Sequence, residues 1–399
     1  MFMKTWLRIL FGCLLCATGR AQPAPTVRHL HGQPLAANQL TARLAWVVDS
    51  AQVTGLSVLV LDRRRVAYEH YFGTKDRRTG EPLDPETVSY AASLTKPVST
   101  YLFLRLVDQG IMALDTPVYR YLKRPIAAYE KWQDLAQDPA FQRITARMLL
   151  SHSSGLPILR ELYGPRLATI APPGTRFFYS NEGFNLLGVV MEERTGLTLQ
   201  ALAERELFGP LRMAHTSFVW QPRFAANRAV AHDATGAVLG YQQRTSARGA
   251  GSMVTTPRDY AAFLGHILAR KGLSRRLYRQ VFAPQTVITS PRGWGPRRDS
   301  TARGPDPQRK AWGLGWGLFT SHYGRAFWHG GHADGWQNFC VAYPREKLAI
   351  ILLSNSDNFE PVADQVLRAC LGTADAPLKW SGFEEAARPA LQPKTSTNK

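Results

Sequence analysis

The order of hydrophobic patterns along the 399-residue chain is the feature that most constrains its fold. Strand-like runs come first, at residues 55–62 and 66–72, with a hairpin turn expected through 63–65. From about residue 96 to residue 263 the pattern is mainly helical. Four strand-like runs then return, at 312–319, 326–330, 336–343 and 348–355. Strands at both ends with helices between them predict an α+β fold in which a helical insertion interrupts one sheet.

Glycine, proline and polar residues indicate where these elements end. One helix is expected to end at Gly110 and another to run from Asn181 to Gly196, because glycine is common just after a helix. A last helix is expected over 361–370. Residues 284–311 are rich in Pro, Gly and Arg, which is typical of a long exposed loop. The polar composition past Gly372 predicts a flexible tail over 373–399.

The first 21 residues have the composition of a signal peptide. Lys4 and Arg8 precede a short apolar run, and small residues near Ala21 stand where a signal peptidase cleaves. The run is shorter than the roughly 20 residues that a membrane span needs, and no later segment reaches that length. We therefore expect a signal peptide over 1–21, a secreted or periplasmic protein and no stable membrane span. An uncleaved N-terminal anchor is the alternative.

The rest of the chain is expected to form one folded domain over 22–372. Its sheet part is expected in about 40–92 and 250–372, and its helical insertion in about 97–250. With 45% hydrophobic residues, a chain of this length can bury a core of that size.

The chain is strongly basic, with a formal net charge of +19 that falls to +16 once Lys4, Arg8 and Arg20 are removed. The basic residues are mostly scattered, and no nucleic-acid-binding motif accompanies them, so we expect no nucleic-acid partner. In an exported protein such a charge favours anionic polymers or membrane surfaces.

Two cysteines remain beyond the signal peptide, Cys340 and Cys370. Both lie in apolar stretches, so a disulfide bond and two buried thiols are both open. Their spacing is not that of a metal site.

Residues 93–96 read Ser-Leu-Thr-Lys and open a helix directly after an expected strand end. Residues three apart on a helix share a face, so the Lys96 ammonium can lie beside the Ser93 hydroxyl. Desolvation would lower the pKa of Lys96 and make it a base for a serine nucleophile. The alternative is a capping serine with a solvated lysine, because so short a pattern is common by chance.

A second pattern, Tyr179-Ser180-Asn181, opens another expected helix. A phenol beside a lysine can have its pKa lowered from about 10, which would let Tyr179 and Lys96 exchange a proton. The Asn181 amide can bind a substrate carbonyl or cap the helix, and capping is favoured when this residue is taken alone.

A third pattern, His329-Gly-Gly-His332, lies in an expected strand. Its glycines let a ligand approach bare backbone. The backbone N–H of His332 could then join that of Ser93 in an oxyanion hole. We expect no metal, because the side chains of His329 and His332 point to opposite faces of a strand.

Together the three patterns, in this order and widely separated, resemble those of the serine β-lactamase and penicillin-binding superfamily. The likeness is to the branch of class C β-lactamases, D-peptidases and esterases. Four further stretches resemble this branch, at 148–157, 172–175, 251–259 and 313–317. The resemblance, which runs from about residue 40 to 370, implies a β-lactamase/transpeptidase-like α+β fold. In such a fold an antiparallel sheet is flanked by helices, a helical domain is inserted, and the site lies in the crevice between them.

The resemblance also implies a role for each matching residue. Ser93 would be the acylated nucleophile, with Lys96 and Tyr179 as the proton-transfer pair. Asn181 would contact the substrate, and the backbone of Gly331 and His332 would form one side of the oxyanion hole. No cofactor is implied.

One substrate-binding position departs from the pattern, because class C β-lactamases carry a lysine where this chain has His329. A histidine with an ordinary pKa near 6.5 is mostly neutral at pH 7. The departure weakens the case for β-lactam hydrolysis or C-terminal carboxypeptidase activity and favours D-aminopeptidase or esterase activity. His152 is expected to brace a loop, and the tryptophans at 312, 316, 328 and 336 to pack in the core.

The sequence therefore predicts an exported serine hydrolase that cleaves an amide or ester of a small molecule or peptide, cell-wall fragments included. The alternative is a non-catalytic relative that binds or senses β-lactams or peptidoglycan fragments and acylates without turnover. Acyl transfer to a second substrate in place of water also stays open.

Overall fold

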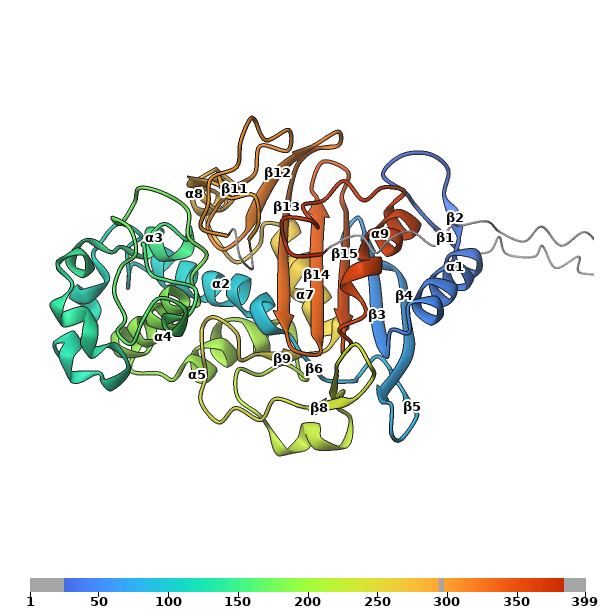
Figure 1. The fold of residues 1–399 in the computed structure, drawn as a ribbon, viewed down its shortest axis with the longest axis horizontal. Coiled ribbons are helices and arrows are strands. Elements are labelled where there is room, and N and C mark those ends of the chain that lie inside the picture. Colours follow the sequence, from blue (N-terminus) through green and yellow to red (C-terminus); the bar gives the residue numbers. More distant parts are fainter. Residues whose placement is uncertain (1–24, 294–297, 384–399) are drawn as a thin grey trace, which may run out of the picture.

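The computed structural model describes residues 25–293 and 298–383. The expected signal peptide over 1–21 lies outside the described residues, as does the part of the expected tail over 384–399. A nine-stranded antiparallel sheet forms the centre, with helices on both faces (Figure 1). The strands lie in the order β10 (Thr286–Val287), β11 (Ala311–Trp312), β12 (Gly317–Ser321), β13 (Gly324–Ala333), β14 (Trp336–Tyr343), β15 (Leu348–Ser354), β3 (Gly55–Asp62), β4 (Arg65–Asp76) and β5 (Glu81–Pro82).

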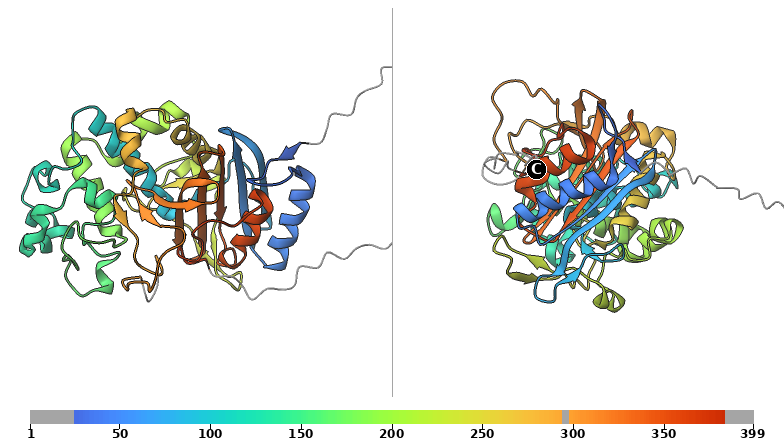
Figure 2. Two further views of the ribbon diagram at one scale, coloured as in Figure 1. Left: turned by 90° about the horizontal axis from the view of Figure 1, so that it is seen from above. Right: turned by 90° about the vertical axis from the view of Figure 1, so that its right-hand side faces the viewer.

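The central strands are apolar along most of their length because both faces of the sheet are buried. In β3, Leu56, Val58 and Val60 pack into the core on one face, and Leu59 and Leu61 into the core on the other. Burying each such side chain contributes about 1.5–3 kcal/mol. Helices α1 (Ala37–Ser50) and α9 (Ala363–Leu371) cover the first face, and α2 (Thr95–Asp108) and α7 (Pro257–Leu268) the second (Figure 2).

The helical insertion begins and ends at one short strand pair. β6 (Ser89–Tyr90) and β9 (Val254–Thr255) pair with each other in a separate two-stranded sheet, and the insertion is the part of the chain between them. After α2, the insertion contains α3 (Ala146–Leu150), α4 (Asn181–Thr195), α5 (Leu199–Ala203) and α6 (Gly209–Leu211). Helices α3 and α4 lie at the opposite end of the molecule from α1 (Figures 1 and 2). The predicted fold class, an antiparallel sheet flanked by helices with a helical insertion, is confirmed.

The remaining elements are short. The pairs β1 (Thr26–Val27) with β2 (Leu35–Ala36) and β7 (Ala231–His232) with β8 (Val238–Gly240) lie outside the main sheet. Helix α8 (Arg275–Val281) follows α7 and leads to the β10 edge of the sheet. Cys340 and Cys370 are free thiols, and they lie in the core on opposite sides of the sheet.

The prediction of a single strand over 312–319 is wrong. The segment forms parts of two strands, because β11 ends at Trp312 and β12 begins only at Gly317. Between them the chain turns at Gly315, which has a left-handed φ of 72°. A Cβ at Gly315 would lie 2.0 Å from the Thr100 hydroxyl oxygen on α2. The close approach of α2 therefore interrupts the strand, and only glycine fits at the turn.

The prediction of a flexible tail over 373–399 is wrong for residues 373–383, the part that the structure describes. Trp380 and Phe383 are buried, although their neighbours in sequence are polar. The Gly293 N–H, in the expected loop over 284–311, donates a hydrogen bond to the Trp380 carbonyl oxygen at 2.7 Å. The loop and the tail segment thus pack on each other beside the sheet, which composition alone does not indicate.

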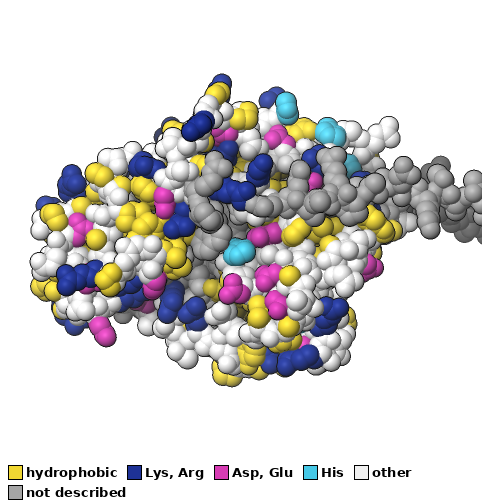
Figure 3. Space-filling view, in the orientation of Figure 1, with side chains coloured by type: hydrophobic (Ala, Val, Ile, Leu, Met, Phe, Trp, Pro, Cys, Tyr) yellow, Lys and Arg dark blue, Asp and Glu magenta, His cyan; other side chains and the backbone are white. Residues whose placement is uncertain are grey.

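Basic and acidic side chains are interspersed over the face of the molecule shown in Figure 3. This distribution agrees with the scattered basic residues of the sequence. Within residues 25–293 and 298–383, no helix is long and apolar enough to cross a membrane.

Candidate active site

Ser93 lies on a tight turn between β6 and α2. The 3₁₀ turn Ala92–Leu94 is preceded by Ala91, whose N–H donates to the Met253 carbonyl oxygen at 2.9 Å. Ala92 has a left-handed φ of 46°, which a residue with a Cβ rarely adopts. Such strain persists only where the surrounding structure holds it, and it is common at functional sites.

Lys96 Nζ has three close polar neighbours beneath the serine. It lies 2.8 Å from Ser93 Oγ, 2.7 Å from Asn181 Oδ1 and 2.9 Å from the Ala250 carbonyl oxygen. The side chain is 0% exposed, so the alternative of a solvated lysine is wrong. Burial lowers the pKa of Lys96 well below the ordinary lysine value, because desolvation disfavours the charged ammonium. No carboxylate of the described residues forms an ion pair with it.

These neighbours suit a neutral amine. Asn181 Oδ1 and the Ala250 carbonyl oxygen can accept the two N–H groups of an uncharged Lys96. The nitrogen lone pair is then left for the Ser93 hydroxyl. The contact with Ala250 could not be predicted from the sequence, because every residue has a backbone carbonyl.

Tyr179 lies beside Lys96, with Nζ 4.8 Å from the centre of the phenol ring. Burial raises the pKa of Tyr179 above its ordinary value, and its contact with Ser93 opposes this only in part. The lowered pKa expected for Tyr179 is therefore wrong, because desolvation of the phenol outweighs its hydrogen bond with Ser93. Burial thus favours the protonated phenol of Tyr179 and the uncharged amine of Lys96.

His152 holds the segment that carries Tyr179. The two ring centres lie 4.3 Å apart, and His152 Nδ1 accepts a hydrogen bond from the Ser180 N–H at 3.0 Å. The Phe178 N–H donates to the His152 carbonyl oxygen at 2.7 Å. These contacts agree with the expectation that His152 braces a loop, and burial lowers its pKa far below the ordinary value.

Ser180, and not Asn181, caps α4. Ser180 Oγ accepts a hydrogen bond from the Gly183 N–H at 2.8 Å. Asn181 stands at the first helical position, and its amide oxygen faces Lys96. The capping role favoured for Asn181 is therefore wrong, because a Ser-Asn pair offers two possible caps and only the backbone geometry selects one.

Strand β13 carries the two histidines of the third pattern past the serine turn. His329 is buried, with Nδ1 2.7 Å from the Gly330 carbonyl oxygen, and desolvation lowers its pKa to about 3, so the ring is neutral. His332 points the other way, with Nδ1 2.7 Å from Glu360 Oε1. In the described part of the chain, no group of three or more His, Cys, Asp or Glu side chains could hold a metal ion.

The two glycines of β13 have different surroundings. A Cβ at Gly331 would lie 2.5 Å from the Ala91 carbonyl oxygen, whereas the nearest atom to a Cβ at Gly330 would be 3.9 Å away. Gly331 is therefore needed because the serine turn packs directly on the strand. Room beside the backbone, which the sequence suggested for both glycines, exists only at Gly330, where a Cβ would make an ordinary van der Waals contact.

A pocket of about 80 Å³ lies over Ser93 and brings together Tyr179, Asn181 and the His329 to His332 segment. Lys96 does not line this pocket and lies beneath it. The pocket has aromatic walls, formed by Trp312, Trp328, Trp380 and Phe383.

The sequence-based expectation for the tryptophans is correct for Trp316 and Trp336, which are buried away from the pocket. Trp312 and Trp328 pack in the core and also line the site. Trp380 was missed because it stands in a segment whose composition resembles a loose tail.

Comparisons with known proteins agree with one another. The profile of the family described as Beta-lactamase matches residues 37–372. Penicillin-binding protein 4* of Bacillus subtilis is 24% identical over 378 residues, which cover 85% of this chain and 75% of that protein. The octameric penicillin-binding protein homologue from Pyrococcus abyssi superposes with a TM-score of 0.69 at 20% identity, covering 88% of this chain and 80% of its own.

A shorter part of the chain is similar to an esterase. Esterase EstB of Burkholderia gladioli is 31% identical over 217 residues, which cover 46% of this chain. The aligned part spans 53% of the esterase.

A glycine of β13 and a glycine of α7 provide a matched pair of variants. Gly331→Ala drives a methyl group into the Ala91 carbonyl oxygen and should displace the Ser93 turn, whereas Gly265→Ala places one in ordinary contact, 3.7 Å from the Arg64 carbonyl oxygen and outside the pocket. A displacement near 1 Å can cost about 100-fold in rate, so Gly331→Ala should slow labelling of Ser93 by a fluorophosphonate by about that factor. Gly265→Ala should label at close to the wild-type rate. Intact-mass spectrometry over time measures both, and equal rates would show that contact between strand and turn is unimportant.

Proposed function

Because the chain belongs to the beta-lactamase family, we propose that it is a serine hydrolase that cleaves an ester or amide through an acyl-enzyme on Ser93. The observation that carries this proposal is the 2.8 Å contact between Ser93 Oγ and a Lys96 amine buried without a counter-charge. An ordinary lysine is protonated at neutral pH and cannot accept a proton, whereas desolvation keeps this one neutral.

In the proposed acylation, Lys96 Nζ takes the hydroxyl proton as Ser93 Oγ attacks the substrate carbonyl carbon. The charge that develops on the carbonyl oxygen is stabilised by the backbone N–H groups of Ser93 and His332. The Tyr179 phenol donates its proton to the leaving oxygen or nitrogen as the scissile bond breaks. The Lys96 ammonium then returns a proton to the Tyr179 phenolate, which restores both groups.

Deacylation uses the same groups with water as the nucleophile. Water attacks the acyl carbonyl and gives a proton to the Lys96 and Tyr179 pair, and Ser93 Oγ leaves with a proton as the carboxylic acid is released. Asn181 accepts a hydrogen bond from Lys96 and fixes the amine beneath the serine, and its amide nitrogen is available to a substrate carbonyl.

A small neutral ester suits this site best. The volume of about 80 Å³ and the aromatic walls fit a short apolar acyl group. The neutral His329 provides no positive charge for a substrate carboxylate, unlike the lysine that class C β-lactamases carry there. The likeness to esterase EstB supports the same substrate class. D-amino-acid amides and β-lactams are proposed as poorer substrates.

We also propose that the protein acts outside the cytoplasm, on account of the signal-peptide pattern over 1–21. The match to penicillin-binding protein 4* supports cell-wall-derived substrates as a further class to be tested. N-terminal sequencing of the exported protein would find Gln22 at or near the new terminus if the segment is cleaved.

The nucleophile is tested by intact-mass spectrometry with a fluorophosphonate and, separately, a penicillin. We expect a single adduct on Ser93, decay of the penicillin adduct with time, and no adduct on Ser93→Ala. Ester hydrolysis by Ser93→Ala should fall more than about 10³-fold. An adduct that never decays, with no ester turnover, would instead identify a binding or sensor protein, and activity in Ser93→Ala would exclude the mechanism.

The pH profile tests the two pKa directions. The neutral amine of Lys96 is the active form and its pKa is lowered, so kcat/KM should be high at neutral pH and fall as acid protonates the amine. The pKa of Tyr179 is raised, so the alkaline loss of activity should begin only above about pH 10. Lys96→Arg, whose guanidinium stays charged, should be inactive throughout. Activity that appears only near pH 10.5 would mean that Lys96 has an ordinary lysine pKa.

Truncation of Trp380 tests the size of the acyl pocket. Trp380→Ala removes one aromatic wall, so the hexanoate-to-acetate ratio of kcat/KM for p-nitrophenyl esters should rise about tenfold or more. The control Trp132→Ala, at a buried tryptophan of the helical insertion, should destabilise the fold by about 3–5 kcal/mol without changing this ratio. An unchanged ratio in Trp380→Ala would show that the segment around Trp380 does not limit the acyl group.

A further inference from the structure

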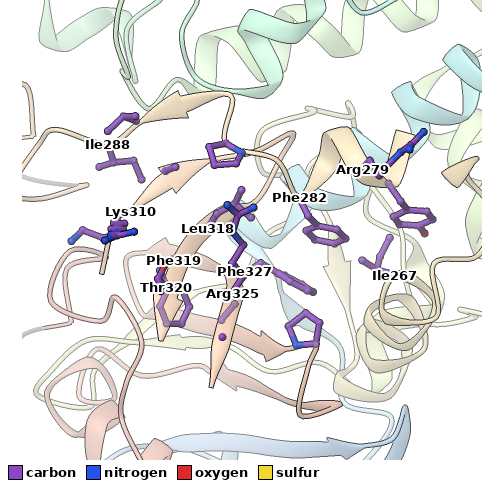
Figure 4. A pocket seen from close by; sticks show the side chains of 18 of the residues that line it. Ile267, Arg279, Phe282, Ile288, Lys310, Leu318, Phe319, Thr320, Arg325 and Phe327 are labelled. Carbon is purple, nitrogen blue, oxygen red and sulfur yellow. The ribbon is translucent and has the colours of Figure 1, made fainter. Parts of the chain in front are cut away.

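A second cavity, separate from the catalytic pocket, opens between α8 and the edge strands of the sheet. Its volume is about 1000 Å³, at the upper end of the range for small-molecule sites. Residues of α7 and α8 line one side, and residues of β10 to β13 line the others (Figure 4). None of its lining residues is shared with the pocket over Ser93.

The interior of this second cavity is apolar. Phe282, Leu318 and Phe327 gather in its middle, and the ring centres of Phe282 and Phe327 lie 4.8 Å apart (Figure 4). Ile267 and Ile288 extend the apolar lining at its two ends. A surface of this kind offers water few hydrogen bonds, so covering it with a hydrocarbon chain is favourable.

The rim of the second cavity is basic. Four exposed arginines line it, at Arg270, Arg279, Arg309 and Arg325. None of the four forms an ion pair with a carboxylate of residues 25–293 or 298–383. Among the described lining residues the single acidic one is Asp306, and Lys310 Nζ neutralises it at 2.7 Å. The mouth of the cavity therefore carries an uncompensated positive charge.

We propose that the second cavity binds a free long-chain fatty acid, with its chain over Phe282, Leu318 and Phe327 and its carboxylate among the rim arginines. The planar arginine side chain matches a carboxylate with two parallel hydrogen bonds. A polyanion without an apolar part would leave the interior unfilled, and a neutral apolar ligand would leave the arginines without a counter-charge. A single-chain carboxylate uses both features. This inference does not depend on the proposed hydrolase activity.

Isothermal titration calorimetry on the full chain tests the site with laurate and decanoate, both below the concentrations at which they form micelles. We expect one saturable site per chain. Each buried methylene contributes about fourfold in affinity, so laurate should bind about 15-fold more tightly than decanoate. Dodecyltrimethylammonium has the same chain length and a cationic head, and it should bind at least about tenfold more weakly than laurate.

Charge-reversal variants test the arginine rim. Arg279→Glu/Arg325→Glu should weaken laurate binding by about tenfold or more. Arg143→Glu/Arg166→Glu makes the same change in net charge at exposed arginines of the helical insertion and should leave the affinity unchanged.

A second pair tests the mouth of the cavity. Val287→Asp places a carboxylate at a valine that is 65% exposed and lines the cavity, and it should weaken binding. Val66→Asp, at a valine 45% exposed on β4, should not. All these positions are exposed, and an unchanged far-UV circular dichroism spectrum and thermal unfolding midpoint confirm that each variant is folded.

Four outcomes would overturn the proposal. The first is the absence of saturable laurate binding to the wild-type chain, and the second is equal weakening by both members of either variant pair. The third is equally tight binding of laurate and dodecyltrimethylammonium. Binding to phosphatidylglycerol vesicles without binding of monomeric laurate would assign this face to a membrane surface and would also overturn it.

Discussion

The buried amine of Lys96 is the interaction on which the rest of the site depends, because it joins segments that are far apart in the sequence. Its neighbours are Ser93 on the turn before α2, Asn181 at the start of α4 and the Ala250 carbonyl just before β9. A buried polar group without a partner costs about 1–3 kcal/mol, so these contacts are required once the amine is desolvated. The Lys96 amine thus links the serine turn to the helical insertion.

Burial is the common cause of the unusual ionisation states around Ser93. Desolvation disfavours whichever form of a group is charged, so it lowers the pKa of Lys96 and of His329 and raises that of Tyr179. The aromatic packing that includes Trp312 maintains this dry environment. A single physical condition, exclusion of water, therefore favours the uncharged forms of all three groups.

The two cavities of the molecule differ in charge although they share strands. On β11 and β13, Ala311 and Phe327 line the large basic-rimmed cavity, and their neighbours Trp312 and Trp328 line the small pocket over the serine. Adjacent residues of a strand point to opposite faces, so one pair of strands can serve two sites. The same two strands therefore line a small pocket with a neutral histidine and a larger cavity with a basic rim.

Features that depend on local periodicity could be predicted from the residues alone. These include the bounds of β3 and β14, the shared face of Ser93 and Lys96, and the opposite directions of His329 and His332. Contacts between distant segments, in contrast, were needed to establish that Ser180 caps α4, that the Tyr179 phenol has a raised pKa and that Trp380 lines the pocket. Capping depends on backbone geometry, and a pKa and a pocket wall depend on which distant residues exclude water, so hydrophobic patterns along the chain carry no record of them.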